Sequence, residues 1–327
     1  MDDLLAALLA SWGVEQSVAA INQIVSPQEY LGNKYFTNRE GKYADNITIP
    51  IYRGDSIIME AIPKGAPRPK TSGSSTHKLP VELARFADSL TITPKDIKDL
   101  KNFDDPNKQQ EEFARLVGFK MGLMKNKFVA TKEYMRMGAI LGTVKDGAGK
   151  TLFDFKSDKA ALGFDVTTDP EGLFESFEDS LVDEFGYSPG MMGFVSREFY
   201  NSIWAYALSK SLVKDGIVRK EVVDGVTQIN YNGRELRPIT ASRPDKHGNA
   251  LRFLDANKAI FFPKGGEAFG EFYTHAEHME ALGGAPDEYF SKVHDLGEGE
   301  GAKVIAESIC IPVCTRPYAV RQAIWTP

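Results

Sequence analysis

Three short motifs in this 327-residue chain carry residue types that could bind a phosphate or a metal ion: Gly149-Lys150-Thr151, His275 with His278, and Cys310 with Cys314. The first motif resembles the end of a phosphate-binding loop, but the leading glycine of that loop would stand at the position of Val144. Such a loop also needs a strand before it and a helix after it. Here a long helical pattern precedes the motif and β-prone residues follow. The sequence therefore predicts a hairpin turn over 146–149 rather than a nucleotide site.

The histidines lie in the segment Tyr273-Thr-His-Ala-Glu-His278, with Glu280 and His294 beyond it. On a helix His275 and His278 would share a face, and together with a carboxylate they could bind zinc. The segment contains no H-E-x-x-H pattern, and no third ligand stands at a defined spacing. A surface or interface position is therefore expected for both histidines, and a metal-dependent hydrolase that uses them is the less favoured alternative.

The cysteines stand four residues apart around Ile311-Pro-Val313, so in a strand they would share one face as two small buried side chains. A zinc ribbon would need a second pair, and the chain has only two cysteines, which fits a reducing compartment. No G-x-S-x-G elbow occurs. The sequence therefore predicts no catalytic residue, no metal site, no cofactor and no enzymatic activity.

The composition further restricts the functional class of the protein. The net charge is -6, from 39 basic and 45 acidic residues, and 42% of the residues are hydrophobic. Such a chain can bury a large core, and it lacks the basic excess of a protein that grips nucleic acid. No run approaches the roughly 18 consecutive apolar residues of a membrane helix. We expect a soluble, intracellular protein without a membrane partner.

The first part of the chain predicts helices followed by a long hairpin. Residues 2–25 have apolar side chains at helical spacing, and Ile47, Ile49 and Ile51 alternate as in a strand, with Pro50 at an edge or a bulge. A second β-prone run covers 57–62. Between 63 and 78 the chain is rich in Pro, Gly and Ser and has no acidic residue, and its basic residues are Lys64, Arg68, Lys70 and Lys78. This segment is either a solvated loop or an arm that lies on an acidic neighbour.

The strongest helix pattern covers 105–141, with Asp105 as the N-cap and Pro106 at the first helical position. One stripe of this helix is expected to pack in the core: Phe113, Leu116, Val117, Met124, Phe128, Thr131 and Met135. Gly118, Gly122 and Gly138 weaken the helix and can admit another backbone. Further on, the patterns predict helices after Asp169 and Ser196 and hairpins at 224–225 and 232–233. Helices and strands mix without a βαβ rhythm, which favours an α+β fold.

The order of these segments resembles that of the major capsid proteins of lambda-like tailed bacteriophages, the phage major capsid protein E family. The resemblance rests on Ile47–Tyr52 leading into the basic loop, Leu90–Ile97 as the return strand, the helix end Gly138–Asp146 running into Gly149–Phe155, and the pieces Phe272–Leu282 and Ile311–Pro317. It implies the Hong Kong-type capsid fold. The implied parts are an N-terminal arm (1–45), an extended E-loop (46–92), a peripheral domain around the long spine helix (93–160), an axial domain (161–294) and a C-terminal return to the peripheral domain (295–327).

The resemblance also implies a function: self-assembly of pentamers and hexamers into an icosahedral shell that encloses double-stranded DNA without binding it specifically. The E-loop residues Lys64, Arg68, Lys70 and Lys78 would contact a neighbouring subunit, and no covalent crosslink is expected. Too few residues precede the E-loop for a fused scaffold, so a separate scaffolding protein is implied. A portal protein and a possible decoration protein are further partners. The location would be the virion capsid, assembled in the host cytoplasm. An encapsulin-like compartment shell is the alternative of the same fold.

Overall fold

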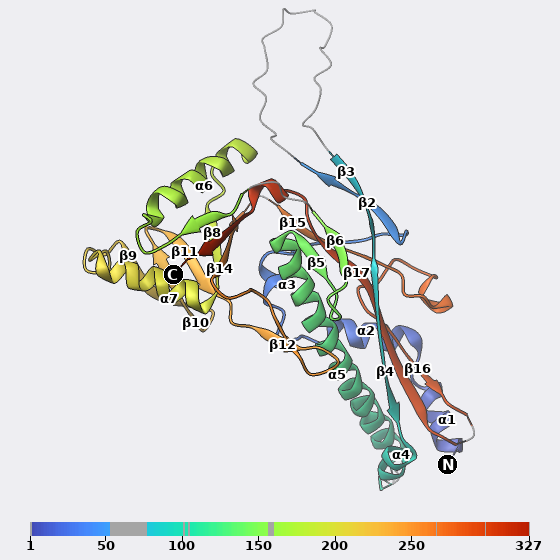
Figure 1. Cartoon of the computed structure of the whole chain (residues 1–327). Coiled ribbons are helices and arrows are strands. Elements are labelled where there is room, and N and C mark those ends of the chain that lie inside the picture. Colours follow the sequence, from blue (N-terminus) through green and yellow to red (C-terminus); the bar gives the residue numbers. More distant parts are fainter. Residues whose placement is uncertain are drawn as a thin grey trace, which may run out of the picture. The chain divides into compact units, whose positions relative to one another are not determined.

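The structure is a computed structural model that describes residues 2–52, 77–100, 102–103, 105–155, 160–265, 267–297 and 299–326. The chain divides into two compact units, which are described separately (Figure 1). The first unit comprises Met1–Ile47, Val81–Glu133 and Glu271–Pro312. The second unit comprises Thr48–Pro80, Tyr134–Gly270 and Val313–Pro327.

A five-stranded sheet is built around the longest strand, β17 (Ala302–Cys314). Its other strands are β1 (Asn38–Gly41), β15 (Phe269–Thr274), β16 (Phe290–Asp295) and β4 (Ala84–Ile92). Residues 302–307 of β17 pair antiparallel with both β16 and β4, so these two strands lie on opposite edges of β17. The sheet thus joins two segments from residues 38–92 to three segments from residues 269–314.

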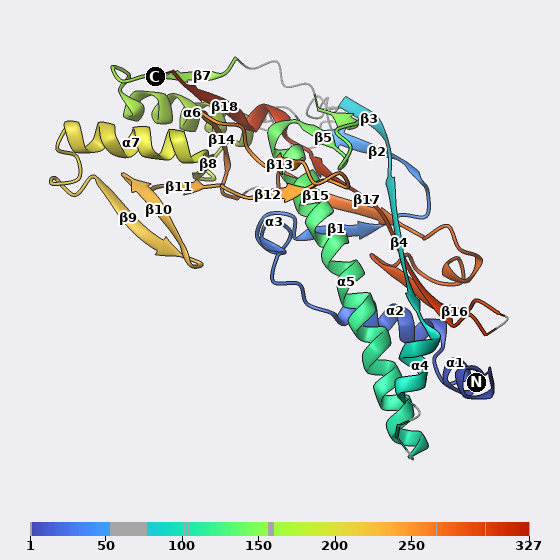
Figure 2. The ribbon, with the colours of Figure 1, turned by 60° about the horizontal axis from the view of Figure 1, so that its bottom comes forward.

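The core of the first unit forms between this sheet and four helices: α1 (Asp2–Ala10), α2 (Val14–Gln23), α4 (Pro94–Leu100) and α5 (Pro106–Leu141). The predicted long helix is confirmed, and Asp105 accepts a hydrogen bond from the Asn107 backbone N–H at 2.9 Å, as a cap does. Phe113, Val117, Met124 and Phe128 are buried in this core, and Leu116 is half-buried against it. α1 and α2 contact β16 (Figure 2).

Within the described residues, no single helix is long and apolar enough to cross a membrane. The bent pair Leu4–Ala10 and Val14–Gln23 passes that test by length and composition together. Its apolar side chains Leu5, Leu8 and Ile21 are buried in the core of the first unit. Their apolar stripe is therefore covered by the protein itself.

The return segment Leu90–Ile97 was expected as a strand throughout, and this is wrong for its second half. β4 ends at Ile92, and α4 begins at Pro94. Thr93 and Asp96 form a reciprocal cap: the Thr93 backbone N–H donates to the Asp96 carboxylate at 2.8 Å, and the Asp96 N–H faces the Thr93 hydroxyl at 3.4 Å. A capping pair with Pro at the first helical position favours a helix over a continued strand.

The second unit contains a seven-stranded sheet in the order β7 (Leu162–Phe164), β18 (Arg321–Trp325), β14 (Lys258–Pro263), β8 (Met191–Val195), β11 (Arg234–Pro238), β10 (Val226–Tyr231) and β9 (Val218–Val223). The predicted turns before β10 and β11 are confirmed, with Asp224 and Asn232 at φ of 51° and 47°. The last strand of the chain, β18, pairs with β14 and β7.

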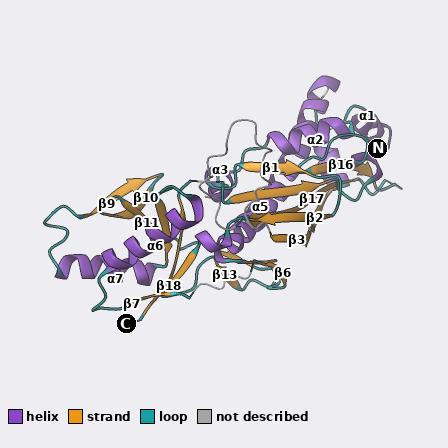
Figure 3. Ribbon diagram, turned by 90° about the horizontal axis from the view of Figure 1, so that it is seen from above, coloured by secondary structure: helices purple, strands orange, loops and turns teal. Residues whose placement is uncertain are grey.

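One face of this sheet carries helices α6 (Pro170–Phe185) and α7 (Arg197–Ser209), drawn in purple beside it in Figure 3. Phe261 of β14 contacts both helices: its ring centroid lies 5.5 Å from that of Phe174 and 6.4 Å from that of Phe199. The predicted caps are confirmed, because Asp169 accepts from the Glu171 N–H and Ser196 accepts from the Phe199 N–H.

Short elements complete the fold. The two-stranded ribbons are β2 (Asn46–Ile51) with β3 (His77–Glu82), β5 (Thr143–Lys145) with β6 (Thr151–Asp154), and β12 (Ser242–Pro244) with β13 (Ala250–Arg252). The single-turn helices are α3 (Tyr30–Lys34), η1 (Met279–Ala281) and η2 (Pro317–Ala319). The β5–β6 pair confirms the predicted hairpin, since the Asp146 carboxylate accepts from the Ala148 and Lys150 N–H groups in its turn. The second β-prone run, 57–62, lies outside the described residues.

Gly138 meets the hairpin that follows α5. A Cβ atom at this position would stand 2.7 Å from the Thr143 carbonyl oxygen and 3.1 Å from the Val144 Cα. We predict that Gly138→Ala lowers the free energy of unfolding by about 1–3 kcal/mol, because backbone atoms would have to move. In contrast, nothing lies within 4 Å of a Cβ at Gly118. Gly118→Ala should raise the free energy of unfolding by up to about 1 kcal/mol. Urea unfolding of both variants tests the pair, and equal effects would contradict the prediction.

Candidate functional site

The predicted interface residues fall mostly outside the part of the chain that the structure describes. Lys64, Arg68 and Lys70 lie in the undescribed segment 53–76. Lys78 is exposed in β3, which pairs with β2 in a two-stranded ribbon. Figure 1 shows this ribbon at the two ends of the undescribed segment. Because it contains two strands, each of them is an edge strand.

The acidic segment 171–184 lies in helix α6, and five of its six carboxylates form two sets. Glu171 and Glu178 bind Arg234 of β11. Glu175, Asp179 and Asp183 are exposed and stand four residues apart, so they share one helical face. The members of this second set are the exposed ones, whereas Glu171 and Glu178 are half-buried. In the other acidic segment, 295–300, the Asp295 carboxylate accepts a hydrogen bond from the Gly297 N–H at 2.9 Å.

Arg234 fixes α6 to the sheet. Its Nε and Nη2 reach the two oxygens of Glu178 at 3.0 and 2.8 Å, and its Nη1 reaches Glu171 at 2.6 Å. The guanidinium also lies 5.7 Å from the centroid of the Phe174 ring. The hydrogen bond to Glu178, together with that to Glu171, holds the Arg234 pKa above its ordinary value against the effect of burial. This bidentate geometry is the strong form of an ion pair.

The Arg234 contacts predict that the stability of the folded protein depends on pH. Burial tends to raise the pKa of Glu171, but hydrogen bonds from Arg234 and Asn232 outweigh it and leave the pKa below 4.5. A carboxyl group whose pKa is lower in the folded than in the unfolded state stabilises the folded protein at a pH above its unfolded-state pKa. This contribution is lost as the pH falls through the folded-state pKa. Wild type should therefore lose its stability advantage over Arg234→Met when urea unfolding is measured at pH 3 instead of pH 6. The matched variant Arg219→Met, at an exposed ion pair with Glu221, should show little of this difference. An advantage that is independent of pH would contradict the prediction.

A buried ionic cluster lies in the first unit and was not anticipated from the sequence. Lys132 of α5 is almost fully buried, and its Nζ lies 2.8 Å from Glu288, 3.2 Å from Glu271 and 4.1 Å from the centroid of the Tyr289 ring. Burial disfavours the charged ammonium, but the nearby carboxylates of Glu271 and Glu288 help hold the Lys132 pKa well above its ordinary value. The signal that could have revealed the cluster is a charged residue on an apolar helix face, four residues after Phe128.

Two other buried charges of α5 hold the N-terminal segment. The Lys125 ammonium donates to the carbonyl oxygens of Ile21 and Asn22, at the C-terminal end of α2. The Glu133 carboxylate accepts from the Leu31 and Gly32 N–H groups at 2.8 and 2.9 Å, in the first turn of α3. A cation at a helix C-terminus and an anion at a helix N-terminus both complement unpaired backbone groups. α5 thereby fixes the position of residues 21–32.

The two histidines do not lie on one helix, so the arrangement that the zinc alternative would require does not occur. His275 follows β15, and its Nε2 lies 2.9 Å from the Gly284 carbonyl oxygen. His278 precedes η1 and stacks on Phe290 with ring centroids 5.1 Å apart. Among the described residues, no group of three His, Cys, Asp or Glu side chains has the arrangement of a metal site.

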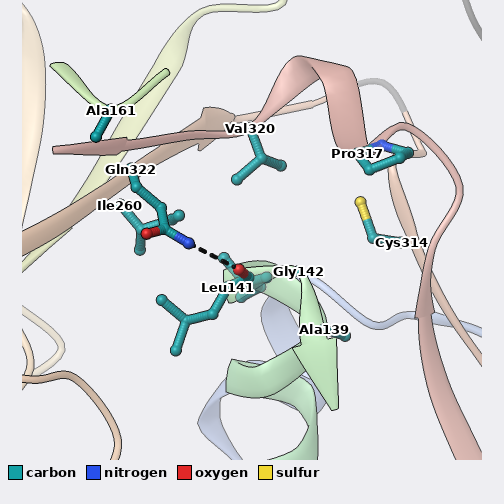
Figure 4. A pocket seen from close by; sticks show the side chains of 10 residues that line it. Ala139, Leu141, Gly142, Ala161, Ile260, Cys314, Pro317, Val320 and Gln322 are labelled. Atoms are coloured by element: carbon teal, nitrogen blue, oxygen red, sulfur yellow. Dashed lines mark hydrogen bonds between the residues drawn. The ribbon is translucent and has the colours of Figure 1, made fainter. Parts of the chain in front are cut away.

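Cys310 and Cys314 both lie in β17 and are almost fully buried. Burial raises the pKa of Cys314 to about 12, which makes its thiol a poor nucleophile. Cys314 lines a small cavity of about 170 Å³ in the second unit (Figure 4). The other side chains labelled there are mainly aliphatic, and the amide of Gln322 donates to the Leu141 carbonyl oxygen at 3.1 Å. No acid–base pair accompanies the thiol in this lining.

Comparison with known proteins gives a family and a fold. The family model described as phage major capsid protein E matches residues 14–324. No curated protein matches the chain. A crystal structure of a protein described as the capsid protein of a prophage of E. coli CFT073 is similar, with a TM-score of 0.63 and 14% identity, over 96% of this chain and 99% of that one.

Two further structures are more distant. The capsid of an empty GTA particle has a TM-score of 0.50 at 9% identity, over 93% of this chain and 92% of that one. The SrpI encapsulin of Synechococcus elongatus PCC 7942 has a TM-score of 0.48 at 12% identity, over 92% and 88%. The TM-score of 0.48 is too low to favour the compartment-shell alternative.

Proposed function

Because the chain belongs to the phage major capsid protein E family, we propose that it assembles into pentamers and hexamers that form an icosahedral shell around packaged DNA. The observation that carries the proposal is the family match, which spans nearly the whole chain. The predicted fold class is confirmed: the chain has a mixed helix and sheet fold similar to the prophage capsid protein, of the Hong Kong type. Membership of a family of capsid proteins implies that this chain has a structural role in the virion.

The division into an N-terminal arm (1–45), an E-loop (46–92), a peripheral domain (93–160, with the tail 295–327) and an axial domain (161–294) belongs to this proposal. In it, α5 is the spine helix of the peripheral domain. The described part of the E-loop comprises the β2–β3 ribbon, in which Lys78 is exposed, and strand β4. Extended ribbons suit shells because strand edges and charged rims add many modest contacts between subunits.

The basic E-loop residues are proposed to meet the exposed acidic face of α6 in a neighbouring subunit. This face is Glu175, Asp179 and Asp183, since Glu171 and Glu178 already bind Arg234. The opposite charges of the two segments support the pairing, because complementary rims fix the register of an interface. Asp295 to Glu300 is the second acidic candidate.

Further partners follow from the family. A separate scaffolding protein, a portal protein and a decoration protein are proposed partners. Assembly is proposed to take place in the host cytoplasm. The shell subunit is proposed to have no enzymatic activity. The net charge of -6 suits a wall around DNA, since a strongly basic interior would hold phosphates and resist release.

We expect no covalent crosslink between subunits, because nothing in the sequence identifies a partner for the E-loop lysines. Shells boiled in detergent should therefore run as intact monomers on a denaturing gel. A ladder of covalent multimers would overturn this expectation. Mass spectrometry of the monomer band, at the mass of the unmodified chain, provides the control.

Electron microscopy of the expressed chain, with and without its neighbouring scaffold gene, tests the proposed function. Uniform icosahedral shells are expected, and a stable soluble monomer would contradict the proposal. The DNA content of particles purified from phage separates a virion shell from a compartment shell. Elemental analysis tests the hydrolase alternative, which requires bound metal that is lost in a His275→Ala, His278→Ala double variant.

A further inference from the structure

A groove lies between α4 and the N-terminal part of α5 in the first unit, with a volume of about 570 Å³. Figures 1 and 2 both show these two helices side by side. Leu100 and Phe103 supply its apolar wall on one side, and Leu116 and Phe119 of α5 supply the other. Phe119 is 65% exposed and Phe103 is 37% exposed. The groove is therefore open to solvent and apolar at its base.

The apolar surface continues along α5 beyond the groove. Leu123 is 43% exposed and stands one turn after Phe119. Between them, Gly122 has nothing within 4 Å of a Cβ position, so another backbone can come close there. From Glu112 to Leu123 the helix rises about 17 Å, or three turns. A surface of this length suits an extended partner element rather than a compact small molecule.

The rim of the groove is acidic. Its charged lining residues are three carboxylates, Asp96, Asp99 and Glu112, against one guanidinium, that of Arg115. Glu112 pairs with Arg115 at 2.7 Å, and Asp96 lies 3.8 Å from the Lys120 ammonium. Asp99 is exposed, and within the described part of the chain no ion pair involves it. With Lys120 included, three carboxylates stand against two cations, and Asp99 supplies the excess negative charge beside the apolar floor.

We infer that this groove binds an amphipathic helix of a partner protein, whose apolar stripe is flanked by lysine or arginine. Helix-in-groove recognition places side chains at i, i+3 or i+4, and i+7 into an apolar groove. The length of the α5 surface matches three such anchors, and the acidic rim selects the basic flanks. The inference concerns a single subunit and stands whether or not the proposed shell geometry is right.

Two labelled peptides of about 18 residues, long enough to form a helix, test this. Both carry the same leucine stripe, flanked by lysines in one peptide and by glutamates in the other. Fluorescence anisotropy with the full-length, unassembled chain should show at least about tenfold tighter binding of the lysine peptide. Equal binding of the two peptides, or no binding of either, would overturn the inference.

Variants of the chain locate the site. The double variant Phe119→Ser, Leu123→Ser should weaken binding at least about tenfold, with unchanged urea unfolding because both side chains are exposed. Asp99→Lys with Glu112→Lys should reverse the preference between the two peptides. Leu208→Ser, at a leucine of α7 whose exposure of 55% lies between those of Leu123 and Phe119, is the matched control and should change nothing. Wild-type binding by the Phe119 and Leu123 variant would contradict this location.

Discussion

Replacing Lys132 by methionine is expected to lower the free energy of unfolding by about 3–5 kcal/mol. Methionine keeps the length and the apolar stem of the side chain but removes its charge. The ammonium lies 3.2 Å from the Glu271 carboxylate, which is fully buried, and 2.8 Å from Glu288. Without it, the buried Glu271 carboxylate loses the cation that lies 3.2 Å from it, so its charge becomes more costly to keep in the interior. Urea unfolding at neutral pH measures the loss.

Two comparisons make this test specific. Lys127→Met removes an exposed lysine of the same helix, which pairs with Asp88 at 2.7 Å with 61% of its side chain exposed, and should cost less than about 1 kcal/mol. The double variant Lys132→Met, Glu271→Met removes both buried charges and should recover a large part of the loss. If Lys132→Met costs no more than Lys127→Met, the ionic cluster does not stabilise the first unit.

Reversing three basic residues of the E-loop, Lys64→Glu, Arg68→Glu and Lys70→Glu, is expected to reduce the yield of shells at least about tenfold. In the proposed interface each new carboxylate would face the acidic surface of α6 on a neighbour, and like charges placed together cost several kcal/mol. Electron microscopy and sedimentation of the coexpressed protein measure the yield. Normal shells from this triple variant would refute the interface.

A matched control separates position from net charge. Lys210→Glu, Lys214→Glu and Lys246→Glu change the net charge equally at exposed positions of the second unit, and should leave assembly nearly intact. A charge swap identifies the partner surface: Glu175→Lys, Asp179→Lys and Asp183→Lys should restore shells when combined with the E-loop reversal. If it does not, the segment 295–300 is the next acidic surface to exchange.

Most local elements could be predicted because their signals are short-range. The cap at Asp105, the caps at Asp169 and Ser196, and the turns at Asp224 and Asn232 each depend on residues within four positions of one another. The error at 90–97 also concerns a short-range signal, because the β-prone residues up to Ile92 are followed directly by the helix cap of Thr93 and Asp96. The zinc alternative for His275 and His278 required a helix over both residues, but β15 ends at Thr274 and η1 begins only at Met279.

Most of the elements, the α+β class and the family resemblance could be predicted from the sequence, since periodicity, caps and the order of segments are properties of neighbouring residues. The tertiary structure alone decided which charges are buried and which glycines are crowded. Lys132 meets Glu288 across 156 positions, and Arg234 meets Glu171 across 63. Such pairs depend on how sheets and helices pack, and packing brings together side chains whose spacing along the chain carries no signal.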